Sequence, residues 1–335
     1  MPDKKIILYE LNEVPEVVFD RYSKESSSFK KLLSKFTRYK TKSIDSVPLS
    51  PWITWSTVHR GVTYEKHKIE NLGQDVSEQN ILYPPIWMDL KNKGYEVGVY
   101  GSMHSNKIPE NISKYKFYIP DPFSEHCKCQ PKSLEPIQDF QLKLSRSSSR
   151  NVQRSFSKQI SLSLISALLK SGLRISSYLG ILKQLIHERF DNKKVNRRRV
   201  FQSVINFDIF ISLLKSDLPH FSTFFTNHVA SAMHRYWEAA YPEDFKGFNK
   251  QSADWILSYK NEVNFAMSVV EKHLKELIKL ANKKENCEIW VCTSMGQAPV
   301  INYEPVKSQL YLKDPNKFLR FLGCDPQLFE IMPAM

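Results

Sequence analysis

The chain has 335 residues, a formal net charge of +13 at pH 7, 41% hydrophobic residues and 25% charged residues. This is the composition of a soluble globular protein large enough for one big domain or two ordinary ones. Only 10 residues are glycine, and neither GxxxxGK[ST] nor GxGxxG occurs, which argues against the common Gly-rich nucleotide-binding sites.

The sequence also disfavours a membrane-spanning or a secreted protein. No apolar run reaches the ~20 residues that cross a bilayer, and the first residues carry no signal-peptide pattern. The five cysteines are an odd number, with Cys287 and Cys292 on a predicted buried strand, which fits reduced thiols. We therefore expect a cytoplasmic protein, with peripheral contact to a membrane as the alternative.

The first third of the chain alternates between short apolar runs and helical patterns. Residues 5–9 predict a buried strand that ends in Glu10. Residues 29–36 predict a helix, Ser50 and Pro51 have the residue types of a helix start, and residues 85–93 predict a helix before Gly94. Strands are predicted over residues 95–100 and, as a short edge strand, 116–119.

The positive charge is concentrated between residues 141 and 200. This window holds 14 Lys or Arg against two acids, Glu188 and Asp191, so the rest of the chain is close to neutral. Leucines and isoleucines within it recur at three- and four-residue steps, which predicts one or two basic amphipathic helices. An anionic membrane surface or an acidic polymer is the partner expected if the segment binds one. Nucleic acid is disfavoured because the segment has few aromatic residues for stacking, and a solvated face of a packed helix is the alternative.

The last third continues the alternation. Residues 221–226 predict a strand, 251–284 a long helix and 288–292 a further strand. Strands that alternate with helices predict an α/β fold with a largely parallel sheet sandwiched by helices, formed by residues 1–140 and 201–335, with 141–200 as a basic helical insertion.

Polar residues recur just after the predicted strands. Ligands of parallel α/β sheets bind outside the carboxyl ends of the strands, so these residues are candidates for one site. They are Glu10, Asn12, Ser102, His104, Asn227, His228, His234, Ser294 and Gln297.

Five segments, taken in order, resemble the alkaline phosphatase superfamily, particularly its type I phosphodiesterase and nucleotide pyrophosphatase branch. They are KIILYELNE, SPWITWSTVHRGVTYEKHKI, PPIWMDLKNKGYEVGVYG, FFTNHVASAMHRYW and EIWVCTSMGQ. The resemblance covers about residues 5–105 and 220–300. It implies an alkaline-phosphatase-like fold and a hydroxyl nucleophile that attacks a phosphate ester with two divalent metals about 4 Å apart.

The metal ligands that the resemblance implies are only partly present. Glu10, His228 and His234 are the candidate ligands, whereas Ser294 and Met295 stand where the family has an aspartate and a histidine. A thioether is a poor ligand for zinc or magnesium. One ion of zinc, magnesium or manganese is therefore favoured over two, and a site without metal is the alternative.

Two functions remain open at this point. The first is a hydrolase or transferase acting on phosphate or, second, sulfate esters. Its nucleophile would be Ser50, preferred over Thr54 because helix-start N–H groups would face the ester, and Asn227 and Gln297 would donate hydrogen bonds to the anion. The second is a catalytically inactive relative that binds an anionic ligand, with the basic insertion contacting a membrane surface or an acidic polymer.

Overall fold

The computed structural model describes residues 4–71, 73–124, 126–147, 162–248, 251–301, 312, 314–325 and 328. It is built around one sheet of five strands, all parallel, in the order β3-β2-β4-β1-β5. The strands are β1 (Lys5–Leu11), β2 (Val97–Tyr100), β3 (Phe117–Ile119), β4 (Phe221–Thr226) and β5 (Cys287–Cys292). The predicted α/β class with a parallel sheet is confirmed, and the strand predicted at 116–119 lies at one edge.

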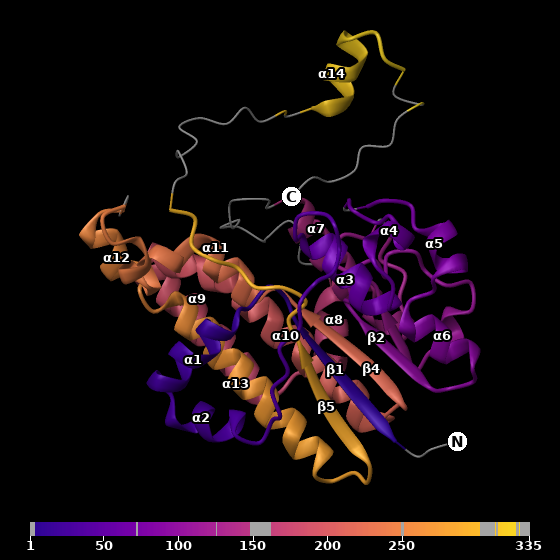
Figure 1. Cartoon of the computed structure of the whole chain (residues 1–335), viewed down its shortest axis with the longest axis horizontal. Coiled ribbons are helices and arrows are strands. Elements are labelled where there is room, and N and C mark those ends of the chain that lie inside the picture. The colour runs from indigo at the N-terminus through magenta and orange to yellow at the C-terminus, as the bar shows by residue number, and fades with distance from the viewer. Residues whose placement is uncertain are drawn as a thin grey trace.

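Helices cover both faces of the sheet, as Figure 1 shows, with α3 to α6 on one side and α1, α2, α9 and α13 on the other. Their bounds in chain order are α1 Glu16–Glu25, α2 Ser27–Leu33, α3 Pro51–Arg60, α4 Tyr64–His67, α5 Ser77–Leu82, α6 Ile86–Asn92, α7 Glu135–Ser147, α8 Leu162–Lys170, α9 Ile175–Phe190, α10 Arg198–Ser216, α11 His228–Ala240, α12 Ala253–Tyr259, α13 Glu262–Ala281 and α14 Pro315–Phe321. Short 3-10 helices include η3 at Asn192–Arg197.

The two-residue period of β1 divides its side chains between two hydrophobic clusters. Ile7 and Tyr9 belong to the larger cluster, which includes residues of α10, α11 and α13. Leu8 belongs to the smaller cluster, with Trp87 of α6 and Val99 of β2. Successive side chains of a strand point to opposite faces, so a strand covered on both faces is apolar throughout. This explains why the apolar runs at β1 and β4 were readable as buried strands.

The long helix predicted over 251–284 is wrong, because the structure has two helices there. Ser252 caps α12 by accepting a hydrogen bond from the Trp255 amide at 3.2 Å, and the chain turns at Asn261 before α13. Tyr259 at the end of α12 stacks on Tyr236 of α11, with ring centroids 4.8 Å apart. Helix α12 therefore packs on α11, and the chain bends at Asn261 so that α13 packs against the sheet.

The strand at Cys287–Cys292 was predicted to be buried, and this is also wrong. β5 is an edge strand whose side chains are half-buried or exposed in alternation. All five cysteines are free thiols.

The predicted basic insertion contains α8 and α9, and α10 begins at Arg198, before the boundary predicted at residue 201. Leu164 and Ala167 of α8 join the large hydrophobic cluster of the sheet. Residues 148–161, which include most of the Ser/Arg-rich part of the predicted insertion, lie outside the described residues. In the part of the chain that is described, no helix has the length and hydropathy needed to cross a membrane.

Candidate functional site at the carboxyl edge of the sheet

The start of α3 leaves the hydroxyl of Ser50 uncommitted. Ser50 occupies the N-cap position with extended backbone and Pro51 is the first helical residue, as predicted, yet the Ser50 side chain accepts no hydrogen bond from the helix. Ser50 is half-buried. An N-cap side chain normally accepts from the second or third helical amide. At this helix start the hydroxyl is instead available to another partner.

Thr54, the alternative nucleophile, is buried one turn further along α3. Its hydroxyl lies 3.0 Å from the Ser50 carbonyl oxygen and 3.3 Å from the Ser294 hydroxyl, which follows β5. A hydroxyl engaged in this way positions the helix against the loop after β5. The geometry therefore favours Ser50 over Thr54 as the group that meets a ligand.

Asn12 links three elements at the edge of the sheet. Its carbonyl oxygen accepts a hydrogen bond from the Trp55 indole at 2.7 Å, and its amide donates to Asn227 at 2.9 Å and to Glu13 at 2.8 Å. Trp55 belongs to α3, and Asn227 directly follows β4. The predicted site residue Asn227 therefore lies beside the end of β1, joined to α3 through Asn12.

Glu13 is the charged centre of this edge. Its carboxylate accepts a hydrogen bond from the Gln297 side-chain amide at 2.6 Å and lies 3.1 Å from Nε2 of His234. The backbone N–H of Gln297 also donates to the backbone carbonyl of Glu13 at 3.1 Å. Burial alone would raise the pKa of Glu13, but hydrogen bonds from His234, Gln297 and Asn12 outweigh it and lower the pKa. The carboxylate is therefore ionised at neutral pH, with its charge shared among three polar side chains.

Gly296 lies in the loop after β5, where that loop packs against the loop after β1. A Cβ atom at Gly296 would come within 2.8 Å of the Pro15 side chain, closer than real contacts allow. Glycine at this position lets the loop after β5 lie against the loop after β1. The close approach brings Gln297 within reach of Glu13.

Backbone strain gathers at the same edge. Glu13, His104 and Ser294 have φ values of 56°, 58° and 53°, a region that side-chain-bearing residues rarely adopt. They follow β1, β2 and β5 respectively. Each such conformation costs about 1–3 kcal/mol, and such residues tend to cluster at functional sites. The carboxyl edge is therefore the strongest candidate site in the described part of the fold.

Glu10, predicted to be a metal ligand, is instead fully buried within the sheet layer. One carboxylate oxygen lies 2.7 Å from Nε2 of His59 on α3, and the other has no hydrogen-bond partner. The His59 ring stacks on Trp55 and meets the edge of Trp87. Glu10 is thus held by His59 beneath α3 and is not part of the Glu13 cluster.

His228, also a predicted ligand, points into the core. Its Nδ1 lies 2.7 Å from the Thr226 hydroxyl and its Nε2 lies 3.1 Å from the Ala266 carbonyl on α13. Burial lowers its pKa to about 4, so the ring is neutral at pH 7. His234 is different, because its side chain is 60% exposed and faces Glu13 and Gln297.

The residues present do not fit the two metals that the resemblance implies. Among the described residues, no group of three or more His, Cys, Asp or Glu could hold a metal ion. Glu10 and His228 have other partners, and Ser294 and Met295, both half-buried, replace ligand types that bind these metals well.

The polar residues that organise the edge were only partly predicted. Asn12 was recognised as a residue after a strand, but Glu13 and Trp55 were not proposed as site residues. The signal available for Glu13 was its place two residues after the end of β1, next to Asn12. The indole N–H of Trp55 carries no signal in a sequence, because tryptophan at helical spacing is read as an apolar residue.

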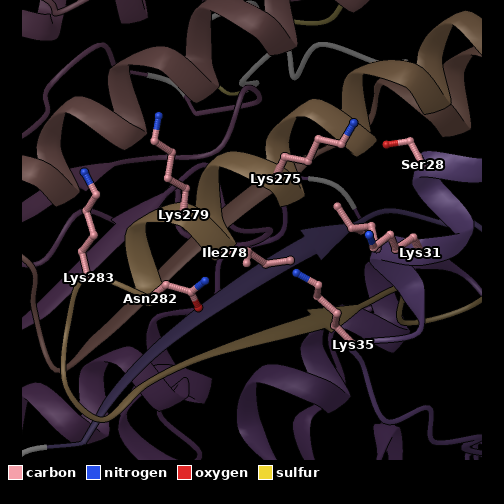
Figure 2. Close-up of a pocket in the computed structure, with 9 residues that line it drawn as sticks. Ser28, Lys31, Lys35, Lys275, Ile278, Lys279, Asn282 and Lys283 are labelled. Atoms are coloured by element: carbon pink, nitrogen blue, oxygen red, sulfur yellow. The ribbon is translucent and has the colours of Figure 1, made fainter.

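A cluster of lysines lies away from this edge, around a groove of about 450 Å³ between α2 and α13. Figure 2 shows Lys275 and Lys279 on α13 and Lys283 just after it, with Lys31 on α2 and Lys35 just after α2 across the groove. Glu271 pairs with Lys275 at 2.6 Å, and no other ion pair to these five lysines occurs in the described structure. Experiments with anions must therefore separate this lysine groove from the carboxyl edge.

Comparison of the chain with protein-family models, with curated proteins and with solved structures found no match in any of the three. The likeness to the alkaline phosphatase superfamily therefore stays a prediction from its five ordered segments.

Proposed function

We propose that the chain is an alkaline-phosphatase-like protein that binds an anionic phosphate or sulfate ester at the carboxyl edge of its sheet. The observation that carries the proposal is the uncommitted hydroxyl of Ser50 at the start of α3. The start of a helix attracts anions through its free N–H groups and its dipole. The Ser50 hydroxyl would donate to the anion, with Gln297 and His234 contacting it from the loop after β5 and from α11.

Binding of the ester is better supported than its hydrolysis by a two-metal site. The donor set does not fit a metal pair, since Glu10 pairs with His59 and His228 bonds within the core. No acid, histidine or lysine of the described residues hydrogen-bonds to the Ser50 or Thr54 hydroxyls, so neither contacts a general base. A serine hydroxyl is a weak nucleophile until a base or a metal activates it.

A hydrolase or transferase that uses Ser50 as its nucleophile is the second candidate. The same observation favours it, because a hydroxyl that the helix does not use is free to attack an ester bound at the helix start. Added zinc, magnesium or manganese would be the test for metal assistance. Turnover of chromogenic phosphate mono- or diesters that disappears in Ser50→Ala would establish this second function in place of the first.

The binding proposal is tested by titrating inorganic phosphate, sulfate and a phosphate monoester into the protein and measuring affinity by calorimetry. Ser50→Ala removes one hydrogen bond to a charged ligand, worth about 1.5–3 kcal/mol, so we expect affinity to fall about ten- to a hundredfold. Lys275→Gln with Lys279→Gln serves as the matched control, because it alters the lysine groove alone. If Ser50→Ala binds like the wild type while the lysine variant loses binding, the anion occupies the groove and the proposal is wrong.

A further inference from the structure

Helix α9 lies in the structure with its polar side inward. Ser177, Gln184 and Glu188 are its buried residues. The exposed residues of the helix are largely apolar, and these are Ile175 at 78%, Leu179 at 61%, Leu182, Leu185, Ile186 and Phe190 at 87%. A surface helix of a globular protein normally buries its apolar stripe and exposes its polar one. The orientation of α9 is the reverse.

Specific hydrogen bonds fix this orientation. The Gln184 amide donates to Glu188 at 2.9 Å and to the Lys194 carbonyl at 2.7 Å. The other oxygen of Glu188 pairs with Arg198 at the start of α10, at 2.7 Å. At the first residue before the helix, Arg174 pairs with the fully buried Asp208 of α10 and with Glu276 of α13. The polar side of α9 is thus bound to the body of the protein at both ends, which leaves the apolar side outward.

The exposed apolar surface extends beyond α9. Ile165 and Leu169 of α8 are exposed as well, and the Tyr178 hydroxyl donates to the Leu168 carbonyl at 3.1 Å, which ties the end of α8 to the first turn of α9. Scattered exposed apolar side chains are ordinary, but a contiguous set of this kind marks an interaction surface. We call Ile175, Leu179, Leu182, Leu185, Ile186 and Phe190 the α9 apolar face.

The charge around this face selects the partner. Between residues 162 and 190 the only acid is Glu188, which is buried and paired, whereas Lys170, Lys183 and Arg189 are exposed. The exposed surface of α8 and α9 is therefore apolar and basic, and neither helix has an exposed acid. A second copy of the chain, docked symmetrically through the same face, would bring these cations together. An anionic lipid surface offers both an apolar interior and opposite charge.

We propose that α9 docks the protein onto the surface of an anionic bilayer. The helix lies in the plane of the interface, with the α9 apolar face at the boundary between headgroups and acyl chains and with Lys183 and Arg189 at the phosphate level. With 16 residues, α9 extends about 24 Å along the membrane at 1.5 Å per residue. The proposal is independent of the ester site, because it rests on a different surface.

Vesicle sedimentation tests this docking with the full chain. The vesicles contain phosphatidylcholine alone or phosphatidylcholine mixed with an equal amount of phosphatidylserine. We expect the wild type to sediment with the mixed vesicles and far less with the neutral ones. Leu182→Ser with Ile186→Ser removes two apolar side chains from exposed positions, and we expect it to weaken binding by about tenfold or more. Lys183→Gln with Arg189→Gln should remove the preference for phosphatidylserine.

The matched control is Ile81→Ser with Leu82→Ser on α5, which removes two exposed apolar side chains elsewhere and should leave sedimentation unchanged. Circular dichroism shows whether each variant keeps its fold. The proposal is overturned if the wild type fails to sediment with the mixed vesicles, or if the α9 and α5 variants sediment equally. It is also overturned if light scattering finds a dimer that the α9 variant abolishes and vesicles do not compete for, since the face would then join two copies.

Discussion

The protein is expected to lose most of its stability when the pH falls from about 6.5 to about 4. Four buried histidines are the cause: burial lowers the pKa of His104 to about 3 and of His67 and His228 to about 4, and that of His273 well below its usual value. The unfolded chain takes up these protons near pH 6.5 while the folded chain does not, so acid favours unfolding throughout this interval. Each histidine changes the free energy of unfolding by about 1.4 kcal/mol per pH unit.

One buried group acts in the opposite direction. Burial raises the pKa of Asp121 to about 7, so the folded protein binds its proton more readily than the unfolded chain over the same interval. It offsets one of the three histidines whose pKa falls to about 3 or 4, which leaves a net loss of about 3 kcal/mol per pH unit and about 7 kcal/mol between pH 6.5 and 4, to which His273 adds. Domains of this kind have about 5–15 kcal/mol in total. The depressed pKa of Glu13 adds a further loss only below about pH 4.5, where the unfolded glutamate becomes protonated.

Urea unfolding at several pH values between 7 and 4.5 measures this effect. His228→Asn should reduce the slope of the unfolding free energy against pH by about 1.4 kcal/mol per unit, whatever it does to stability at pH 7. A free energy of unfolding that stays constant from pH 7 to 5 in the wild type would contradict the buried neutral state of these rings.

The second large effect is expected at the pair of Glu10 and His59. Both side chains are buried, they lie 2.7 Å apart, and the second oxygen of Glu10 already lacks a partner. His59→Leu leaves the carboxylate without its one partner in a dry environment. We expect a loss of about 3–5 kcal/mol in the free energy of unfolding, measured by urea denaturation at pH 7.

Two further variants distinguish the buried pair of Glu10 and His59 from an exposed ion pair. Glu10→Leu combined with His59→Leu replaces the pair with apolar groups and should recover most of the lost stability. Lys4→Ala breaks the exposed pair with Glu288, 2.8 Å long, and should change the free energy of unfolding far less than His59→Leu does. If the double variant is as unstable as His59→Leu alone, Glu10 has a role other than pairing with His59, such as the metal ligation first predicted for it.

The sequence predicted the sheet well because each strand carries a short run rich in aromatic and β-branched residues. The run at β4 was placed at Phe221–Thr226, where the structure has it, since a strand buried on both faces leaves a continuous signal. The helix start at Ser50 was equally readable from its residue types. Helix breaks were harder to predict from the sequence. Nothing in the apolar periodicity marks Asn261, where the packing of α12 on α11 bends the chain.

The site was predictable only in outline. The edge itself followed from the parallel sheet, and Asn227, His234 and Gln297 do lie at it, while Thr54 reaches the same edge through its contact with Ser294. Which partner each side chain takes depends on contacts far apart in the chain, such as Glu10 with His59, and no local pattern encodes them. The orientation of α9 shows the same limit, because periodicity reveals that a helix has an apolar face but not which way that face points.

We propose that an anionic ester binds at the carboxyl edge beside Ser50. A crystal structure of the protein soaked with tungstate, a heavy analogue of phosphate and sulfate, tests it most directly. We expect the ion at the start of α3, with an oxygen within hydrogen-bond distance of the Ser50 hydroxyl and a second contact from Gln297 or His234, and we expect it to be absent there in Ser50→Ala. Tungstate bound only in the lysine groove between α2 and α13, with the start of α3 empty, would contradict the claim.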